Sequence, residues 1–389
     1  MKIGILTYHR ATNYGAVLQA YSLISFLKKK FPTHSFELID YATKRASIDH
    51  KKEELSGLLR LGFGHYFEIK RKNAMFKKFS DSLPLSKKHF CSDNITSLFK
   101  YMNKEYEAII VGSDAVFSWN GKRFPTAYFL DKDSKYIKIS YAASAHRLFY
   151  RDATIKQIEY CKNTLNTYDY IGVRDDETKS FVQFMCGNNI SIHHNCDPTF
   201  LIDLDLLKKQ FDINALYLKY NIDKDKKIII VMSADEEIGR IVRDNFRNED
   251  YFIISLFVKN KFIDCFIPDL SPFEWAVIFS IAELTITEYF HATILSLLNC
   301  TPTISIDMLP YSSSYEGKIK DLMFTRLSLP DLYLNIDDIK NGNYHKIVEC
   351  ADLVLSSKDD VKKRIKKSVE NEKGHFDAFL GYLNGILNE

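Results

Sequence analysis

The sequence predicts an α/β protein with two Rossmann-like domains that face a cleft. Short apolar segments of strand length alternate with longer segments of helical periodicity, first from residue 3 and again from residue 227, and this alternation is typical of parallel sheets covered by helices. A polar stretch rich in Asn, Asp and Lys separates the two series, and 389 residues are too many for one compact domain. We therefore expect a boundary at 211–225, an N-terminal domain at 1–210, a C-terminal domain at 226–350 and a helical segment at 351–389.

Composition argues against several classes of protein. The net charge of +3 is too small to indicate a partner made of nucleic acid, and an apolar fraction of 46% is ordinary for a globular protein. The seven cysteines are never spaced as Cys-x-x-Cys, which argues against a zinc site or a disulfide scaffold and fits a reducing cytoplasm. No apolar segment has the length of a signal or of a membrane span. We expect a cytoplasmic protein that contacts a membrane only peripherally, at its inner face.

The N-terminal domain opens with a strand, a helix and a strand, predicted at Ile3–Leu6, Tyr14–Lys30 and Phe36–Ile39. The helix has a broad apolar face, and Asn13 is well placed as its N-cap. This order is the signature of a parallel α/β sheet. The loop at residues 7–13 contains neither G-x-G-x-x-G nor G-x-x-x-x-G-K-[ST], so it indicates neither a dinucleotide nor a P-loop nucleotide.

Residues 44–78 form a basic insertion. Lys and Arg outnumber Asp and Glu there by ten to four, and the segment Leu55–Phe67 is apolar and aromatic. Such a segment can dock on an anionic membrane surface. The alternative, which we favour, is a pair of solvated helices that cover an edge of the sheet.

Three further strands of this domain are predicted at 107–111, 137–142 and 170–173, with helices at 153–167 and 177–185. Polar residues follow each strand, and in parallel sheets ligands bind at the carboxyl ends of strands. Asp114 is either catalytic or a cap for the next turn. Arg174 either binds a planar oxyanion or forms an ion pair with Asp175 or Asp176. The pair His193-His194 has no third ligand nearby and is interpreted as structural.

The second series repeats this pattern. Strands are predicted at 227–232, 251–257, 284–287 and 303–306, and helices at 236–246, 272–282, 290–298, 314–325 and 358–387, the last with a break at Gly374. The turn that carries Glu288, Tyr289 and His291 stands at a strand end and a helix N-terminus, where an anion is favoured. His291 either meets a phosphate or carboxylate, or moves a proton near pH 7, or simply caps backbone groups.

Together, the candidate anion-binding groups are Asn13, Asp114 and Arg174 in the first domain, and His291 and Lys318 in the second. A cleft lined by such groups suits a transferase that acts on an anionic donor. The residues alone do not name that donor.

Six sequence motifs indicate a more specific function. In chain order they are Ala-Thr-Asn13-Tyr-Gly15-Ala-Val-Leu-Gln19-Ala-Tyr, Val-Gly-Ser-Asp114, the run from Tyr128-Phe-Leu to Ile-Ser-Tyr-Ala-Ala-Ser144, Val173-Arg174-Asp175-Asp176-Glu177-Thr178, Asp197-Pro198-Thr199 and Thr287-Glu288-Tyr289-Phe290-His291-Ala292-Thr293. This succession, over roughly residues 3–330, resembles the polysaccharide pyruvyl transferase family. The resemblance implies a GT-B-like fold and transfer of pyruvate from phosphoenolpyruvate to a sugar, usually as a cyclic ketal, in the synthesis of a capsule or exopolysaccharide.

The resemblance also implies roles for single residues. His291 would contact the donor phosphate or act as the acid, Arg174 would hold the carboxylate or phosphate, Asp114 would be the base, and Asn13 would orient substrate. Glu288, Tyr289 and Lys318 would complete the substrate-binding set, with Tyr289 standing where the family often has serine or arginine. Neither a metal nor a cofactor is implied. The acceptor would be a sugar, including the case of a lipid-linked oligosaccharide, for which the basic insertion would supply a membrane contact.

Two other classes of function remain open at this point. A GT-B glycosyltransferase would use a nucleotide sugar, and a nucleoside diphosphate would then stabilise the protein where phosphoenolpyruvate would not. A non-catalytic relative would bind a glycan without releasing phosphate. Arg174 and His291, both at motif positions, favour an active enzyme.

Overall fold

The computed structural model describes the chain except for residues 44–66, 68, 93–94, 120–123, 147, 248, 257–258, 314–316, 341 and 389. Of the apolar segment Leu55–Phe67 only Phe67 is described, so the membrane contact predicted from this segment lies outside the described residues. The described chain forms two compact units, Met1–Ile202 with Gly374–Glu389, and Asp203–Lys373. Among the described residues, no helix is long and apolar enough to cross a membrane.

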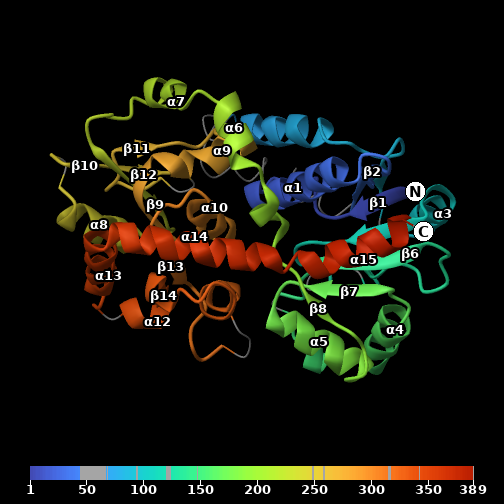
Figure 1. Ribbon diagram of the computed structural model, residues 1–389. Coiled ribbons are helices and arrows are strands. Elements are labelled where there is room, and N and C mark those ends of the chain that lie inside the picture. The colour runs from blue at the N-terminus through green and yellow to red at the C-terminus, as the bar shows by residue number, and fades with distance from the viewer. Residues whose placement is uncertain are drawn as a thin grey trace. The chain divides into compact units, whose positions relative to one another are not determined.

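The first unit is built on a parallel sheet (Figure 1). Six strands, counted over its described residues, pair in the order β2-β1-β5-β6-β7-β8. Its strands are β1 (Lys2–Leu6), β2 (Ser35–Leu38), β5 (Ala108–Val111), β6 (Ile137–Ala143), β7 (Tyr170–Val173) and β8 (His193–His194). Parallel neighbours need crossover connections, which include α1 (Tyr14–Lys30), α3 (Thr96–Glu105), α4 (Ile155–Leu165) and α5 (Asp176–Cys186). A small parallel sheet pairs β3 (Tyr41–Ala42) with β4 (Phe90–Cys91), and residues 69–81 are helical.

The second unit repeats the plan. Over the residues described there, six parallel strands follow the order β11-β10-β9-β12-β13-β14. The strands are β9 (Lys227–Met232), β10 (Tyr251–Ser255), β11 (Cys265–Phe266), β12 (Ala282–Thr287), β13 (Thr303–Asp307) and β14 (Tyr333–Asn335). The helices are α6 (Leu204–Gln210), α7 (Ile213–Lys219), α8 (Glu236–Asn245), α9 (Pro272–Ile278), α10 (Phe290–Leu298), α11 (Lys318–Lys320), α12 (Ile336–Ile339), α13 (His345–Ser356) and α14 (Lys358–Gly374). The predicted doubling of the α/β series is therefore confirmed.

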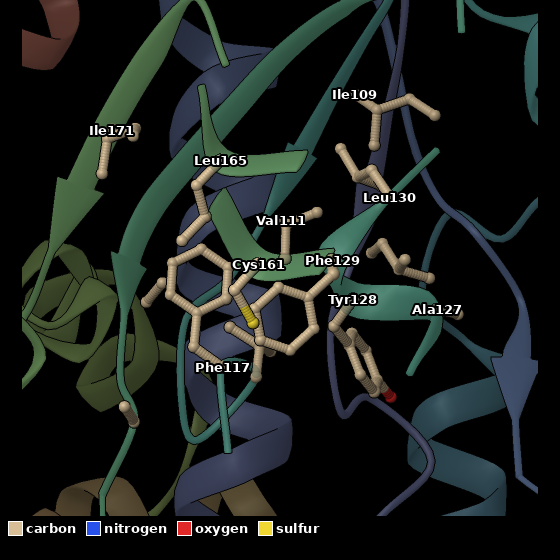
Figure 2. Packing of buried hydrophobic residues seen from close by; sticks show 14 of the residues in the cluster. Ile109, Val111, Phe117, Ala127, Tyr128, Phe129, Leu130, Cys161, Leu165 and Ile171 are labelled. Carbon is tan, nitrogen blue, oxygen red and sulfur yellow. The ribbon is translucent and has the colours of Figure 1, made fainter. Parts of the chain in front are cut away.

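The core of the first unit is aromatic. Phe117 and Phe129 stack with ring centroids 5.4 Å apart, and both side chains are fully buried. Figure 2 shows them within the cluster that also contains Val111, Cys161 and Leu165. Val111 ends β5 and Phe117 follows its loop, so this packing fixes the segment between them, which carries Asp114.

The division into units differs from the predicted boundaries. The polar stretch 211–225 holds α7, which Asp212 caps, and the first unit already ends at Ile202. The C-terminal segment is also not separate, because α15 (Asp377–Asn388) belongs to the first unit. Figure 1 shows α15 running across β6 and β7, where Phe379 packs on Tyr141 at 4.6 Å and on Tyr170 at 5.6 Å between ring centroids. Burial of these aromatic rings holds α15 against the first sheet.

The helix predicted at 314–325 is confirmed from Lys318 onward, although only its first turn is α-helical, and residues 314–316 lie outside the described residues. Lys318–Lys320 is a single α-helical turn that continues as a π-helix over Asp321–Arg326. Gly317 precedes this turn, and a Cβ at that position would lie 1.8 Å from the Asp307 carboxylate. The carboxylate at the end of β13 therefore requires a glycine here.

The docking of α15 predicts a large effect of one core substitution. Phe379→Ala should destabilise the protein by about 3–5 kcal/mol, because a fully buried ring is removed from its packing against the sheet. Urea denaturation measures this change. Ile155→Ala is the matched control, since that side chain is 75% exposed and its loss should cost under about 0.5 kcal/mol. A similarly small cost for Phe379→Ala would contradict the packing.

Candidate functional site

The carboxyl ends of β5, β6 and β7 meet at one edge of the first sheet. Asp114 follows β5 and pairs with Ala143 of β6 through an isolated parallel bridge. The Asp114 carbonyl accepts a hydrogen bond from the Ser144 N–H at 2.9 Å, and the Ala143 carbonyl accepts one from the Arg174 N–H at 3.0 Å. Because the strands are parallel, the polar side chains of three loops arrive at the same edge, where open α/β sheets bind ligands.

Asp114 leaves its strand in a left-handed conformation, with φ of 74°. Aspartate tolerates this region better than most residues. Gly112, two residues earlier, has φ of 126°, and a Cβ there would lie 2.0 Å from the Tyr141 carbonyl oxygen. The Asp114 Oδ1 accepts a hydrogen bond from the Ala115 N–H at 2.8 Å. The carboxylate therefore does cap its turn, and its role as a base stays a prediction.

Arg174 is buried among carboxylates. Its Nη1 donates to Asp197 Oδ2 at 3.0 Å, and its Nε lies 3.8 Å from Asp175 Oδ2. Burial lowers the pKa of Arg174, but the charges of Asp197, Asp114 and Asp175 outweigh this and raise it. The ion pair with Asp175 that the sequence suggested is present. The shorter of the two contacts, however, is the one with Asp197, which is not a neighbour of Arg174 in the sequence. Contact of Arg174 with a donor anion stays a prediction.

Asn13 is the N-cap of α1, as the sequence predicts. Its Oδ1 accepts a hydrogen bond from the Ala16 N–H at 3.1 Å, and the residue is exposed. The same helix supplies Gln19, whose Oε1 accepts from Ser113 Oγ at 2.6 Å. Thus α1 positions Asn13 at its start and supports the loop before Asp114 with its second turn.

Sequence reasoning missed a cluster around Asp40, after β2. The Asp40 carboxylate is 5% exposed and accepts hydrogen bonds from Arg10 Nε at 2.8 Å and Arg10 Nη2 at 2.7 Å. His9 Nε2 lies 3.3 Å and His89 Nδ1 3.1 Å from its oxygens. Burial raises the pKa of Asp40, but the hydrogen bonds from His9, Arg10 and His89 hold it well below its usual range. The adjacent His9 and Arg10 in the first loop were the available signal.

In the second unit, Glu288 fastens the loop after β9. Its Oε2 accepts from Ser233 Oγ at 3.0 Å, and its Oε1 accepts from the Ala234 N–H at 3.1 Å. The loop leads into α8, so Glu288 joins the carboxyl ends of two adjacent strands, β12 and β9. Both carboxylate oxygens thus serve the protein itself, and substrate binding by Glu288 stays a prediction.

The start of α10 gathers cationic and donor groups. Tyr289 is the N-cap residue and makes no side-chain cap hydrogen bond, while burial and Glu288 raise the pKa of its hydroxyl. The His291 ring stands edge-on to Phe290, with centroids 5.2 Å apart. Lys318 Nζ lies 5.3 Å from the centroid of the same Phe290 ring. Side chains from two segments therefore converge on Phe290 at a helix N-terminus.

The structure thus brings two of the predicted residues together within each unit. Asp114 and Arg174 are electrostatic neighbours in the first, and His291 and Lys318 flank Phe290 in the second. Over the described ranges, no three His, Cys, Asp or Glu side chains are arranged to hold a metal ion. The cleft predicted between the domains stays a prediction.

The family model of polysaccharide pyruvyl transferase matches residues 13–308, and thus most of the chain and all six motif regions. The protein belongs to the polysaccharide pyruvyl transferase family. This membership supports a transferase of polysaccharide biosynthesis. No curated protein matches the sequence.

Solved structures establish the fold of this pyruvyl transferase family member. It is similar to UDP-GlcNAc 2-epimerase from Neisseria meningitidis at a TM-score of 0.58 and 9% identity, covering 100% of both chains. The enzyme from Methanocaldococcus jannaschii gives 0.54 and 14%, covering 91% of this chain and 93% of that one. A putative epimerase from Listeria monocytogenes gives 0.54 and 10%, covering 100% and 96%. These are GT-B fold proteins, and the predicted GT-B-like fold is confirmed.

The burial of Arg174 predicts a structural cost for its removal. Arg174→Ala should destabilise the pyruvyl transferase family protein by about 3–5 kcal/mol, because Asp197 and Asp175 would remain as buried, uncompensated charges. Urea denaturation tests this, with the exposed Arg151→Ala as control. Adding Asp197→Asn should recover part of the loss. Simple additivity of the two changes would contradict a direct pair.

The Asp40 cluster predicts a pH-dependent contribution to stability. A carboxyl whose pKa is depressed by folding stabilises above its unfolded value of about 3.9, and this stabilisation is lost as pH falls toward the folded value. The destabilisation by Asp40→Asn should therefore shrink by about 1 kcal/mol between pH 7 and pH 3. Urea denaturation at both pH values measures it, with the exposed Asp133→Asn as control. An unchanged or growing cost at pH 3 would contradict the depressed pKa.

Proposed function

We propose that this protein transfers pyruvate from phosphoenolpyruvate to two hydroxyls of a sugar, forming a cyclic ketal on a surface polysaccharide or its lipid-linked precursor. Membership of the family supports the reaction class. The observation that carries the donor assignment is the convergence of His291 and Lys318 on Phe290 at the start of α10.

This arrangement suits the charge of the proposed donor. Phosphoenolpyruvate carries a phosphate and a carboxylate, and a helix N-terminus offers backbone N–H groups and a positive dipole end to such anions. Lys318 adds a full positive charge, and His291 adds a ring that can donate a hydrogen bond or a proton. Both residues are partly exposed, while the Nε2 atom of His291 is buried.

The chemistry needs proton transfers at three places. The methylene carbon of the donor gains a proton and becomes a methyl group, and two acceptor hydroxyls lose theirs as two C–O bonds form. The C–O bond to phosphate breaks, and phosphate leaves with the remaining proton. In this proposal His291 protonates the donor or stabilises the departing phosphate, and such a group contributes about a hundredfold or more.

Arg174 has a different part in this proposal. Its guanidinium already neutralises Asp197 and Asp175, so it keeps the carboxyl ends of β7 and β8 together and tempers the negative charge near Asp114. Asn13 is exposed and lies in the loop that follows β1, at the carboxyl edge of the first sheet. In this proposal it orients the acceptor, and these residues of the first unit together bind the acceptor.

Phosphoenolpyruvate should raise the melting temperature, since a ligand at about 100 times its dissociation constant stabilises by about 2.7 kcal/mol. Lys318→Ala should weaken this binding about 10- to 100-fold, because a charge-assisted contact is worth about 1.5–3 kcal/mol. Thermal shift titration measures both, and the exposed Lys340→Ala in the same unit is the control. A shift with uridine or guanosine diphosphate, and none with phosphoenolpyruvate, would instead indicate a glycosyltransferase. Sugar binding with no phosphate release would indicate a non-catalytic glycan-binding protein.

A further inference from the structure

The cluster around Asp40 contains two histidines with different surroundings. His9 is fully buried, and its Nδ1 lies 3.2 Å from the Thr7 carbonyl while its Nε2 faces Asp40. The His89 side chain is 52% exposed, and its Nδ1 is the atom that faces Asp40. His9 is therefore enclosed by the protein, whereas about half of the His89 side chain is open to solvent.

Asp40 determines the tautomer of His89. The carboxylate is ionised and can only accept hydrogen bonds, so Nδ1 of His89, at 3.1 Å, must carry the proton. In the neutral ring the lone pair then stands on Nε2, the nitrogen away from Asp40. A carboxylate that orients an imidazole and leaves its other nitrogen basic is the arrangement found in hydrolytic triads.

The chain around His89 is hydrogen-bonded to the backbone of Asp40. The Asp40 carbonyl accepts from the Phe90 N–H at 2.8 Å, and the Asp40 N–H donates to Ser86 Oγ at 2.9 Å. Phe90, next to His89, and Ser86, three residues before it, thus both bond to the backbone of Asp40. Arg10 supplies the compensating positive charge in a two-bond contact with the carboxylate.

The pair lies at the edge where polar loops gather. Asp40 follows β2, and β3 with β4 continues beyond it. Within the first loop, His9 and Arg10 contact Asp40, while Tyr8 donates to the Ala115 carbonyl at 3.2 Å, beside Asp114. One short segment therefore connects the Asp40 cluster to the loop that carries the base predicted from the sequence.

We propose that His89 is a general base for an acceptor sugar hydroxyl and that Asp40 is its positioning residue. The inference rests on the proposed pyruvyl transfer and adds to it a base that the motifs do not contain. Asp114 is a weaker candidate, because its Oδ1 already caps the Ala115 N–H and Arg174 lies nearby. His89 offers a half-exposed ring whose Nδ1 faces Asp40.

The step balances within the proposed reaction. The acceptor O–H bond breaks, its proton moves to His89 Nε2, and the oxygen electron pair forms a bond to the carbon that bears the phosphate ester. That carbon's methylene neighbour has gained a proton, and the imidazolium is stabilised by Asp40. The imidazolium later returns its proton to the departing phosphate or to solvent.

The first experiment measures phosphate release from phosphoenolpyruvate, with a mixture of p-nitrophenyl hexosides and N-acetylhexosaminides as acceptors. His89→Ala and His89→Gln should lower kcat about a hundredfold or more, with the melting shift by phosphoenolpyruvate unchanged. Added imidazole should restore part of the rate in His89→Ala. His34→Ala is the matched control, because His34 lies before β2, at the opposite edge of the sheet, and contacts the N-terminal amine.

Its outcomes separate the two proposals. If the wild type binds phosphoenolpyruvate and releases phosphate, and His89→Ala has a kcat within about threefold of it, the role of His89 is overturned and the proposed function stands. If the wild type neither binds phosphoenolpyruvate nor releases phosphate, the proposed function is overturned and the role of His89 with it.

The second experiment needs no acceptor. Nitrogen NMR of the full chain labelled at histidine should show His89 protonated at Nδ1 near neutral pH, and Asp40→Asn should abolish this preference. The same variant should lower kcat more than it changes KM, and shift the pH profile of kcat. Arg10, His9, Asp81 and Lys77 surround the pair, so Asp81→Asn controls for a general change in local charge. A wild-type His89 protonated at Nε2 would overturn the proposal.

Discussion

The buried ion pair between Arg174 and Asp197 holds the polar edge of the first sheet together. It joins the carboxyl end of β7 to the chain that follows β8, and Asp175 and Asp114 add their charges to the same guanidinium. Burial alone would disfavour each of these charges. Collected around one cation, they fix the geometry from which Asp114 and the loops beside it reach solvent.

The cluster around Asp40 is organised in the same way, but with the signs of the charges reversed. There one buried carboxylate, Asp40, collects Arg10, His9 and His89. In each cluster several partners from separate loops compensate the buried charge. Such compensation is required because an unpaired charge in a protein interior is strongly unfavourable. The difference lies in exposure: Arg174 is enclosed, whereas the Asp40 cluster includes one half-exposed side chain that can act on a ligand.

The elements of this fold could be predicted because they follow from local patterns. Short apolar segments predicted most of the strands. Asn13 was recognisable as a helix N-cap, and Gly374 as the residue at which a helix ends. The return of α15 to the first sheet could not be read, because it depends on Phe379 meeting Tyr141, which is distant in sequence. The Asp40 cluster was missed for the same reason: Asp40 is separated from Arg10 by 30 residues, and no spacing rule connects them.

For the site residues, too, the position in the chain was predictable but the contacts were not. Motif positions located Asp114, Arg174 and His291 correctly at loop and helix starts, yet a motif does not say what else a side chain must do. Glu288 holds the loop after β9 with both oxygens, and Asp114 caps its own turn. A residue that supports the scaffold in this way is less available for chemistry. Availability therefore has to be judged from partners and exposure, and by that measure the half-exposed ring of His89 is better placed to meet a ligand than the carboxylates of Asp114 and Glu288.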